Sequence, residues 1–142
     1  MNATGYSTWE GTWKAGEGTI STATDTVRDA PYSFASRFEG APGASPEELL
    51  AAAHAGCFNQ ALANNFGMND LTATRIETAV TVEMGKDEEG HPAIVGLSVT
   101  VEAKVPGASQ EIFDHCAERA RTRCSIAKAL KVEIGLKAKL LA

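Results

Sequence analysis

The segment over residues 45–66, SPEELLAAAHAGCFNQALANNF, most constrains the fold, because it predicts one long helix that is apolar on nearly every side. Ser45 suits the N-cap, Pro46 suits the first helical position, and Glu48 completes a capping box with Ser45. The alanine- and leucine-rich run favours a helix that ends before Gly67. We therefore expect this helix at the centre of the fold or of a dimer.

The remaining segments predict an α+β protein that forms one domain over residues 1–142. The expected order is β-β-β-α-β-β-α-β, with antiparallel sheets around two central helices. The further elements that we expect are a hairpin over 5–24, a strand over 31–40, a hairpin over 76–105, a helix over 109–124 and a strand over 131–142.

Alternation along the expected strands predicts which side chains face the core. In the strand over 31–40, the aromatic side chains share one face and Arg37 lies on the opposite face. In the hairpin over 76–105, alternation places Met84 and Val95 inward together with the neighbouring valines. In the second helix, a stripe of small and apolar residues ends at Cys124.

Composition argues against several classes of function. The 142 residues carry a formal net charge of −5 and no basic stripe, which argues against nucleic-acid binding. No segment reaches the roughly 18 apolar residues of a membrane helix. The N-terminal residues also lack the pattern of a signal peptide. We therefore expect a cytoplasmic protein.

The chain has three cysteines, Cys57, Cys116 and Cys124, and no CxxC pair. An odd and sparse set of cysteines favours free thiols in a reducing compartment. Simple packing explains most cysteines in alanine-rich helices, and we expect this role for Cys116. Cys57 differs because Cys124 lies on the inward stripe of the only other long helix, so that packing of the two helices can pair their sulfurs.

A reactive cysteine needs a nearby group that stabilises its thiolate. Cys57 is too far from the helix start for the helix dipole to act on it, so Arg37 is the candidate cation. The alternative for Arg37 is a surface ion pair. Glu47 lies ten residues before Cys57, about 15 Å along the helix, and cannot touch it. A glutamate at this sulfur would come from a second copy of the chain.

A metal site is the competing chemical interpretation. His54 and Cys57 are three residues apart on one helix, and His115, Cys116 and Cys124 are further possible ligands. The chain contains no ligand pair of the zinc-finger or HExxH type, so we expect no metal. His54 is better explained as a core or interface residue.

Three segments together resemble the OsmC/Ohr family of osmotically inducible proteins and organic hydroperoxide reductases. They are the opening WEGTW, the block YSFASRFEGAPGASPEELLAAAHAGCFNQAL and CSIAKAL near the end. The likeness spans essentially the whole chain, and Arg37 in SRFEG places it nearer the OsmC branch than the Ohr branch. One departure is Ser125, which stands where family members commonly carry proline.

The resemblance implies an OsmC-like fold and an intertwined homodimer that reduces organic hydroperoxides and hydrogen peroxide without a metal or cofactor. By this analogy Cys57 is the peroxidatic thiolate and Cys124 the resolving thiol, which form a disulfide during turnover. Arg37 stabilises the thiolate, and Glu47 orients the arginine. The reductant implied is a dithiol of the lipoyl type. The alternative hypothesis is a non-catalytic dimeric domain that binds a small apolar ligand at the subunit interface.

Overall fold

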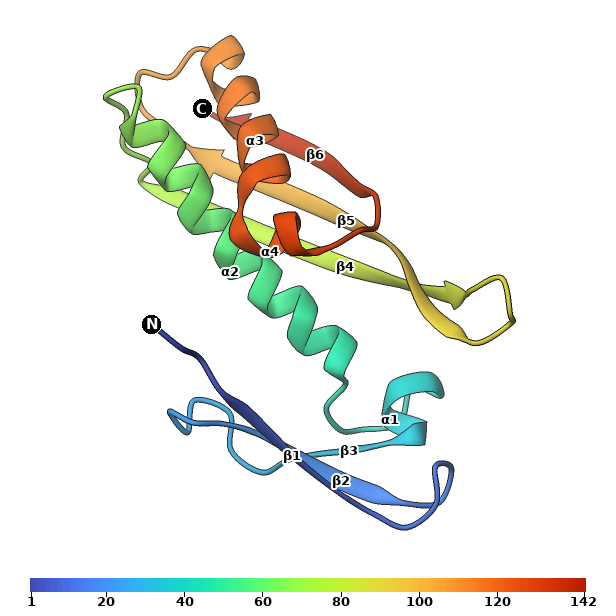
Figure 1. Cartoon of the computed structure of the whole chain (residues 1–142). Coiled ribbons are helices and arrows are strands. Elements are labelled where there is room, and N and C mark those ends of the chain that lie inside the picture. The colour runs from blue at the N-terminus through green and yellow to red at the C-terminus, as the bar shows by residue number, and fades with distance from the viewer. The chain divides into compact units, whose positions relative to one another are not determined.

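The computed structural model describes all 142 residues, and the chain forms two compact units, Met1–Leu49 and Leu50–Ala142. Figure 1 shows the elements of each unit coloured along the chain. The eight expected elements are present, and two short helices, α1 and α4, are added to them.

The first unit contains a three-stranded antiparallel sheet in the order β1-β2-β3. Its strands are β1 (Gly5–Glu10), β2 (Glu17–Thr22) and β3 (Ala30–Ser33). Gly5 pairs with Thr22 and Glu10 with Glu17, which confirms the expected hairpin. The turn-forming residues between β1 and β2 thus reverse the chain where the sequence predicts it.

The expected strand over residues 31–40 is wrong beyond its first residues. The strand β3 ends at Ser33, and the chain continues as a short helix, α1 (Phe34–Phe38). Ser33 and Ser36 form a capping box, in which each side chain accepts a hydrogen bond from the backbone N–H of the other. Phe34 and Phe38, four residues apart, therefore pack against each other on one side of α1, with ring centroids 5.0 Å apart and ring planes tilted by 50°.

The long helix predicted from residue 45 onwards is α2 (Pro46–Gly67). The Ser45 hydroxyl accepts a hydrogen bond from the backbone N–H of Glu48 at 3.1 Å, as an N-cap does. The Glu48 carboxylate does not return a bond to Ser45, so the expected capping box is only half formed. One face of α2 is buried, and it carries His54, Phe58, Leu62, Asn65 and Phe66.

The second unit packs helices on one face of a three-stranded sheet in the order β4-β5-β6 (Figure 1). The sheet contains β4 (Arg75–Lys86), β5 (Pro92–Lys104) and β6 (Ile134–Leu141), and the helices besides α2 are α3 (Gln110–Arg123) and α4 (Ser125–Ala129). Alternate residues of β5 from Leu97 to Ala103 are buried, whereas the side chains between them are more exposed. This sheet face and the apolar sides of α2 and α3 enclose one hydrophobic core.

The expectation of antiparallel sheets is wrong for the last strand. The strands β4 and β5 are antiparallel, but β6 runs parallel to β5, with Leu97 paired to Ile134 and Lys104 to Leu141. The helices α3 and α4 connect β5 to β6, and such a crossover lets the second strand run in the same direction as the first.

A register shift in the β4–β5 hairpin corrects two further expectations. Glu83 pairs with Gly96 and Met84 with Ile94, which leaves Val95 without a partner. The extra residue forms a bulge, and both Met84 and Val95 are exposed rather than inward. None of the helices combines the length and the apolar character that crossing a membrane requires.

Candidate functional site

Cys57 lies at the edge of the core, where α2 meets the start of α4. Its Sγ atom is 3.3 Å from the hydroxyl oxygen of Ser125. The cysteine is partly buried and packs against the core cluster of the second unit. The sulfur is thus held by two elements that are 68 residues apart along the chain.

Cys124 occupies the junction between α3 and α4. Its backbone N–H donates to the carbonyl of Ala120 at 3.1 Å and ends α3, and its sulfur accepts the N–H of Ala127 at 3.4 Å and caps α4. The extended backbone at Cys124 (φ −62°, ψ 147°) separates the two helices. Only 2% of Cys124 is exposed, so both caps fix a buried thiol.

The pKa values of Cys57 and Cys124 move in opposite directions. Burial raises the pKa of Cys57, but hydrogen bonds from Ser125, Ile126 and Cys124 outweigh burial and lower it below its usual value. Burial raises the pKa of Cys124, and so does the neighbouring Cys57. The hydrogen bond from the Ala127 N–H lowers this pKa but does not outweigh them. Of the two thiols, Cys57 is therefore the one that loses its proton at the lower pH.

Cys116 lies apart from this pair on the buried side of α3. Burial raises the pKa of its thiol against the opposing charge of Arg119. The amide of Asn69 donates to its sulfur at 3.6 Å, and the amide of Asn65 donates to its carbonyl oxygen at 3.0 Å. Cys116 is completely buried and belongs to the hydrophobic core.

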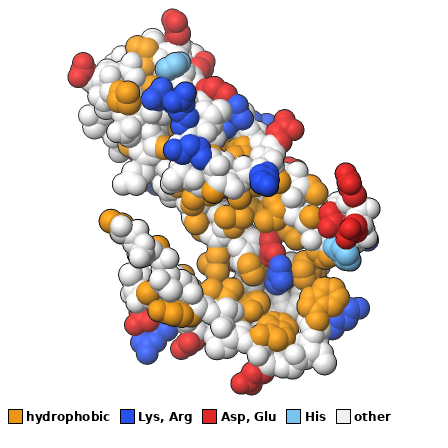
Figure 2. Space-filling model, viewed as in Figure 1, with side chains coloured by type: hydrophobic (Ala, Val, Ile, Leu, Met, Phe, Trp, Pro, Cys, Tyr) orange, Lys and Arg blue, Asp and Glu red, His pale blue; other side chains and the backbone are white.

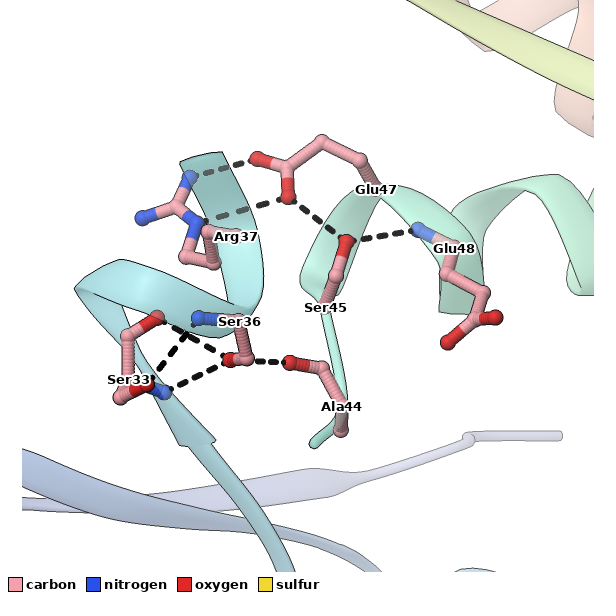
Figure 3. Close-up of polar contacts among 7 residues, drawn as sticks. All are labelled: Ser33, Ser36, Arg37, Ala44, Ser45, Glu47 and Glu48. Carbon is pink, nitrogen blue, oxygen red and sulfur yellow. Dashed lines mark hydrogen bonds and ion pairs between the residues drawn. The ribbon is translucent and has the colours of Figure 1, made fainter. Parts of the chain in front are cut away.

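Arg37 and Glu47 form a forked ion pair within the first unit (Figure 3). Arg37 Nη2 is 2.5 Å from one carboxylate oxygen of Glu47, and Nε is 3.4 Å from the other. A two-point contact of this kind fixes the plane of the guanidinium as well as its position. The guanidinium also lies over the ring of Phe38, 4.7 Å from its centroid.

The loop between α1 and α2 brings the two charged residues together. Ser36 at the centre of α1 donates its hydroxyl to the carbonyl oxygen of Ala44 at 2.8 Å, which ties the end of this loop to α1 (Figure 3). Ser45 then donates its hydroxyl to the second oxygen of Glu47 at 3.0 Å. Burial raises the pKa of Glu47, but the bonds from Arg37 and Ser45 outweigh it, so the pKa is lowered and the carboxylate stays ionised.

An aromatic pocket adjoins Arg37 in the first unit. Its volume is about 240 Å³, and its lining consists of Trp9, Trp13, Tyr32, Phe34, Arg37 and Phe38. Trp9 and Tyr32 both pair with Gly18 of β2, and a Cβ at Gly18 would lie 2.9 Å or less from either ring. Figure 2 shows hydrophobic side chains gathered on the surface over α1. The pocket suits an apolar group bound near a fixed positive charge.

His54 is buried in the second unit, and neither of its ring nitrogens has a hydrogen-bond partner. Burial lowers the pKa of this histidine, because a charged ring would lose its hydration without compensation. The expectation of a core histidine is thus confirmed. No group of three or more His, Cys, Asp or Glu side chains in the structure is arranged to hold a metal ion.

The structure therefore assembles the sequence candidates as two pairs. Cys57 lies with Cys124 in the second unit, and Arg37 lies with Glu47 in the first. The sequence marked Ser125 only as a residue that replaces a common proline, and its contact with Cys57 was not predicted. Its position directly after Cys124 is the one local signal that could have pointed to this contact.

Three comparisons describe what the chain is similar to. The family model for OsmC-like proteins matches residues 38–139. A peroxiredoxin OsmC of Escherichia coli K12 is 40% identical over 132 residues, which cover 93% of this chain and 92% of that protein. The organic hydroperoxide resistance protein OhrB of Bacillus subtilis superposes with a TM-score of 0.68 at 25% identity, over 97% of this chain and 98% of that one. An OsmC-like protein of Mycoplasma pneumoniae superposes with a TM-score of 0.76 at 14% identity, over 100% and 99%, which bears on the fold alone.

Proposed function

This chain belongs to the OsmC-like family, and from that premise we propose that it is a thiol-dependent peroxidase that reduces organic hydroperoxides and hydrogen peroxide. Cys57 is the peroxidatic residue and Cys124 the resolving residue. The protein uses its own thiols and no metal or prosthetic group. The peroxiredoxin OsmC and OhrB relatives support the reaction class by their names.

One observation carries the proposal: two contacting thiols have pKa values displaced in opposite directions. A peroxidatic cysteine must ionise, because the thiolate is the nucleophile. A resolving cysteine has to stay close and remain unoxidised until the first sulfur has reacted. Cys57 and Cys124 fit these two roles. Cys116 fits neither, because its raised pKa does not suit a nucleophile and no second thiol is among the groups that act on its sulfur.

The first step is attack of the Cys57 thiolate on the terminal oxygen of the hydroperoxide. The sulfur–oxygen bond forms as the oxygen–oxygen bond breaks, and Cys57 becomes a sulfenic acid. The alkoxide that departs takes up a proton and leaves as the alcohol. A guanidinium near the departing oxygen would stabilise the developing negative charge.

The second step joins the two cysteines of one chain. The Cys124 sulfur attacks the Cys57 sulfenic acid, water leaves, and a disulfide forms. A dithiol then reduces the disulfide in two exchange steps, gives up two protons and two electrons, and becomes a cyclic disulfide itself. A lipoyl-type dithiol is our candidate for this reductant.

Arg37 and Glu47 act, in this proposal, on the cysteine pair of a second copy of the chain. In the helix α2, Glu47 is ten residues from Cys57, about 15 Å by helix geometry, so it cannot serve the sulfur of its own chain. A homodimer also accounts for apolar surface that the single chain leaves open. This surface includes Tyr6, Trp9 and Trp13 and the exposed small residues Ala52, Ala53 and Gly56 of α2.

The proposed domain organisation and compartment follow from the same premise. The family match over residues 38–139 crosses the boundary between the two compact units, which supports one OsmC-like domain over the whole chain. Three free cysteines support a reducing, cytoplasmic setting.

A second candidate function rests on the aromatic pocket beside Arg37. A protein that only bound a small apolar ligand could use this pocket without any thiol chemistry. In the peroxidase proposal, the same pocket receives the organic group of the hydroperoxide. The two functions differ in whether Cys57 is consumed by peroxide.

Consumption of cumene hydroperoxide in the presence of dihydrolipoamide tests the proposal. We expect turnover by the wild type and by Cys116→Ser, and none by Cys57→Ser. Cys116→Ser is the control for the general loss of a thiol. Turnover by folded Cys57→Ser would refute the assignment of the nucleophile, and absence of turnover and of any peroxide-dependent thiol loss in the wild type would favour the binding function.

A further inference from the structure

The hydroxyl group of Ser125 is the side-chain oxygen in contact with the Cys57 sulfur. The two atoms are 3.3 Å apart, within hydrogen-bonding distance for a contact that involves sulfur. Ser125 makes no other side-chain hydrogen bond in the protein, so its hydroxyl proton is free to turn towards the sulfur. Ser125 also begins α4 directly after Cys124, so the residue that contacts the Cys57 sulfur is the chain neighbour of the second thiol.

We propose that the Ser125 hydroxyl group donates a hydrogen bond to Cys57 Sγ and thereby stabilises this sulfur as a thiolate from within its own chain. The inference rests on the proposed function of Cys57 as the reacting sulfur. It assigns to Ser125 a part of the activation that Arg37 would otherwise supply alone.

The chemistry of the two groups fixes the direction of the hydrogen bond. A serine hydroxyl keeps its proton at any pH that the folded protein experiences, whereas a cysteine thiol loses its proton. Once Cys57 is ionised, its sulfur can only accept, and Ser125 is then the donor. A hydrogen bond to a charged acceptor is stronger than one to a neutral acceptor, so the contact favours the thiolate over the thiol.

The pKa directions agree with this geometry. After the opposing effect of burial, the side chain of Ser125 is the leading cause that lowers the pKa of Cys57. The backbone of Ser125 lowers the pKa of Cys57 as well, as does that of Ile126. Ser125 therefore contributes through its hydroxyl and through its own N–H.

The backbone at Ser125 allows the hydroxyl to be removed first and the N–H together with it second. Ser125 is the first residue of α4, a position that proline accepts, and Cys124 has the extended conformation that suits a residue before proline. Ser125→Thr keeps the hydroxyl and the N–H. Ser125→Ala removes the hydroxyl alone, and Ser125→Pro removes both donors.

The test is the pH dependence of Cys57 alkylation by iodoacetamide, followed at the Cys57 peptide by mass spectrometry so that the other thiols do not contribute. At a pH where Cys57 is only partly ionised, we expect Ser125→Ala to react about three- to tenfold more slowly than wild type, the effect of losing one typical intramolecular hydrogen bond. Ser125→Pro should react more slowly still, and Ser125→Thr at a rate near wild type. In each slow variant the midpoint of the profile should move to higher pH.

The matched control is Ser98→Ala, which removes a serine hydroxyl that donates to Glu83 at 3.0 Å instead of to a thiol. This variant should have the wild-type alkylation profile. A wild-type profile for Ser125→Ala, or a Ser125→Thr profile equal to that of Ser125→Ala, would overturn the inference even if peroxide turnover persists. Conversely, the expected series in a protein that forms no disulfide with peroxide would uphold the role of Ser125 and refute the proposed function.

Discussion

Arg37 and Glu47 meet through both oxygens of the carboxylate, with the closer pair of atoms 2.5 Å apart. The side chain of Glu47 is only 12% exposed, and Ser45 holds one of its oxygens from the opposite side. The orientation of the guanidinium is therefore set by a carboxylate that is itself held in place. An arginine fixed in this way pays little entropy when it meets an anionic sulfur or a peroxide.

Glu47→Gln should impair catalysis far more than folding. The amide cannot accept two charged hydrogen bonds as the carboxylate does, so Arg37 loses its fixed orientation. We expect kcat/KM for an organic hydroperoxide to fall by about one to two orders of magnitude, and the free energy of unfolding by about 1 kcal/mol or less. Both are measured by peroxide consumption and urea denaturation.

Glu48→Gln is the control for this substitution. Glu48 lies in the same turn of α2, but only its backbone N–H is used, in the bond to Ser45. It should retain wild-type turnover. Equal loss in both variants would assign the effect to the charge of the helix start and remove Glu47 from the site.

Cys124→Ser should separate the two chemical steps. One equivalent of hydroperoxide should still oxidise Cys57 to the sulfenic acid, which a dimedone adduct reports. No intramolecular disulfide can follow, so repeated exposure should convert Cys57 to the sulfinic acid. Normal cycling of this variant with a dithiol would show that Cys124 is not the resolving residue.

Cys57 should react with peroxide and with alkylating agents before Cys116 and Cys124 do. The pKa of Cys57 lies below the ordinary thiol value of 9.0, whereas burial raises the pKa values of Cys116 and Cys124. The rate of peroxide consumption should thus rise with pH through a midpoint below 9.0 and level off above it. A midpoint at or above 9.0 would contradict the activation of Cys57.

His54 should make the protein sensitive to acid. Its pKa in the folded protein is lowered from 6.5, so between that lowered pKa and about 6.5 the unfolded chain binds up to one more proton than the folded chain. The free energy of unfolding should then decrease as the pH falls, by up to about 1.4 kcal/mol per pH unit from this group. Urea denaturation between pH 8 and pH 5 measures the slope.

His54→Leu should flatten this pH dependence, because leucine has a similar volume and does not titrate. His91→Gln is the matched control, since His91 lies in the exposed turn between β4 and β5. An unchanged slope in His54→Leu would assign the acid sensitivity to other groups.

The main helices and most strands follow from local sequence, because capping residues and apolar periodicity act within a few residues. The segment over residues 31–40 shows the limit of this reasoning. Phe34 and Phe38 have the same parity in a strand and are also four residues apart, so both patterns fit, and the Ser33–Ser36 capping box decides for α1. The bulge at Val95 arises from pairing with β4, which no pattern within β5 reveals.

The candidate site could be predicted from the sequence only in part. The cysteines, Arg37 and Glu47 could be singled out by residue type and by family resemblance. The contact between Cys57 and Ser125 depends on how α2 packs against the start of α4, and its partners are 68 residues apart. The direction of β6 likewise depends on the crossover through α3 and α4 rather than on the alternation within the strand.

The central claim is that Cys57 and Cys124 form a disulfide when Cys57 reduces a hydroperoxide. Intact-mass measurement after one equivalent of cumene hydroperoxide, with peptide mapping, tests it most directly. The account predicts that the wild-type chain loses the mass of two hydrogen atoms and that mapping joins the Cys57 and Cys124 peptides. An unchanged mass, or a disulfide that joins any other pair of cysteines, would contradict it.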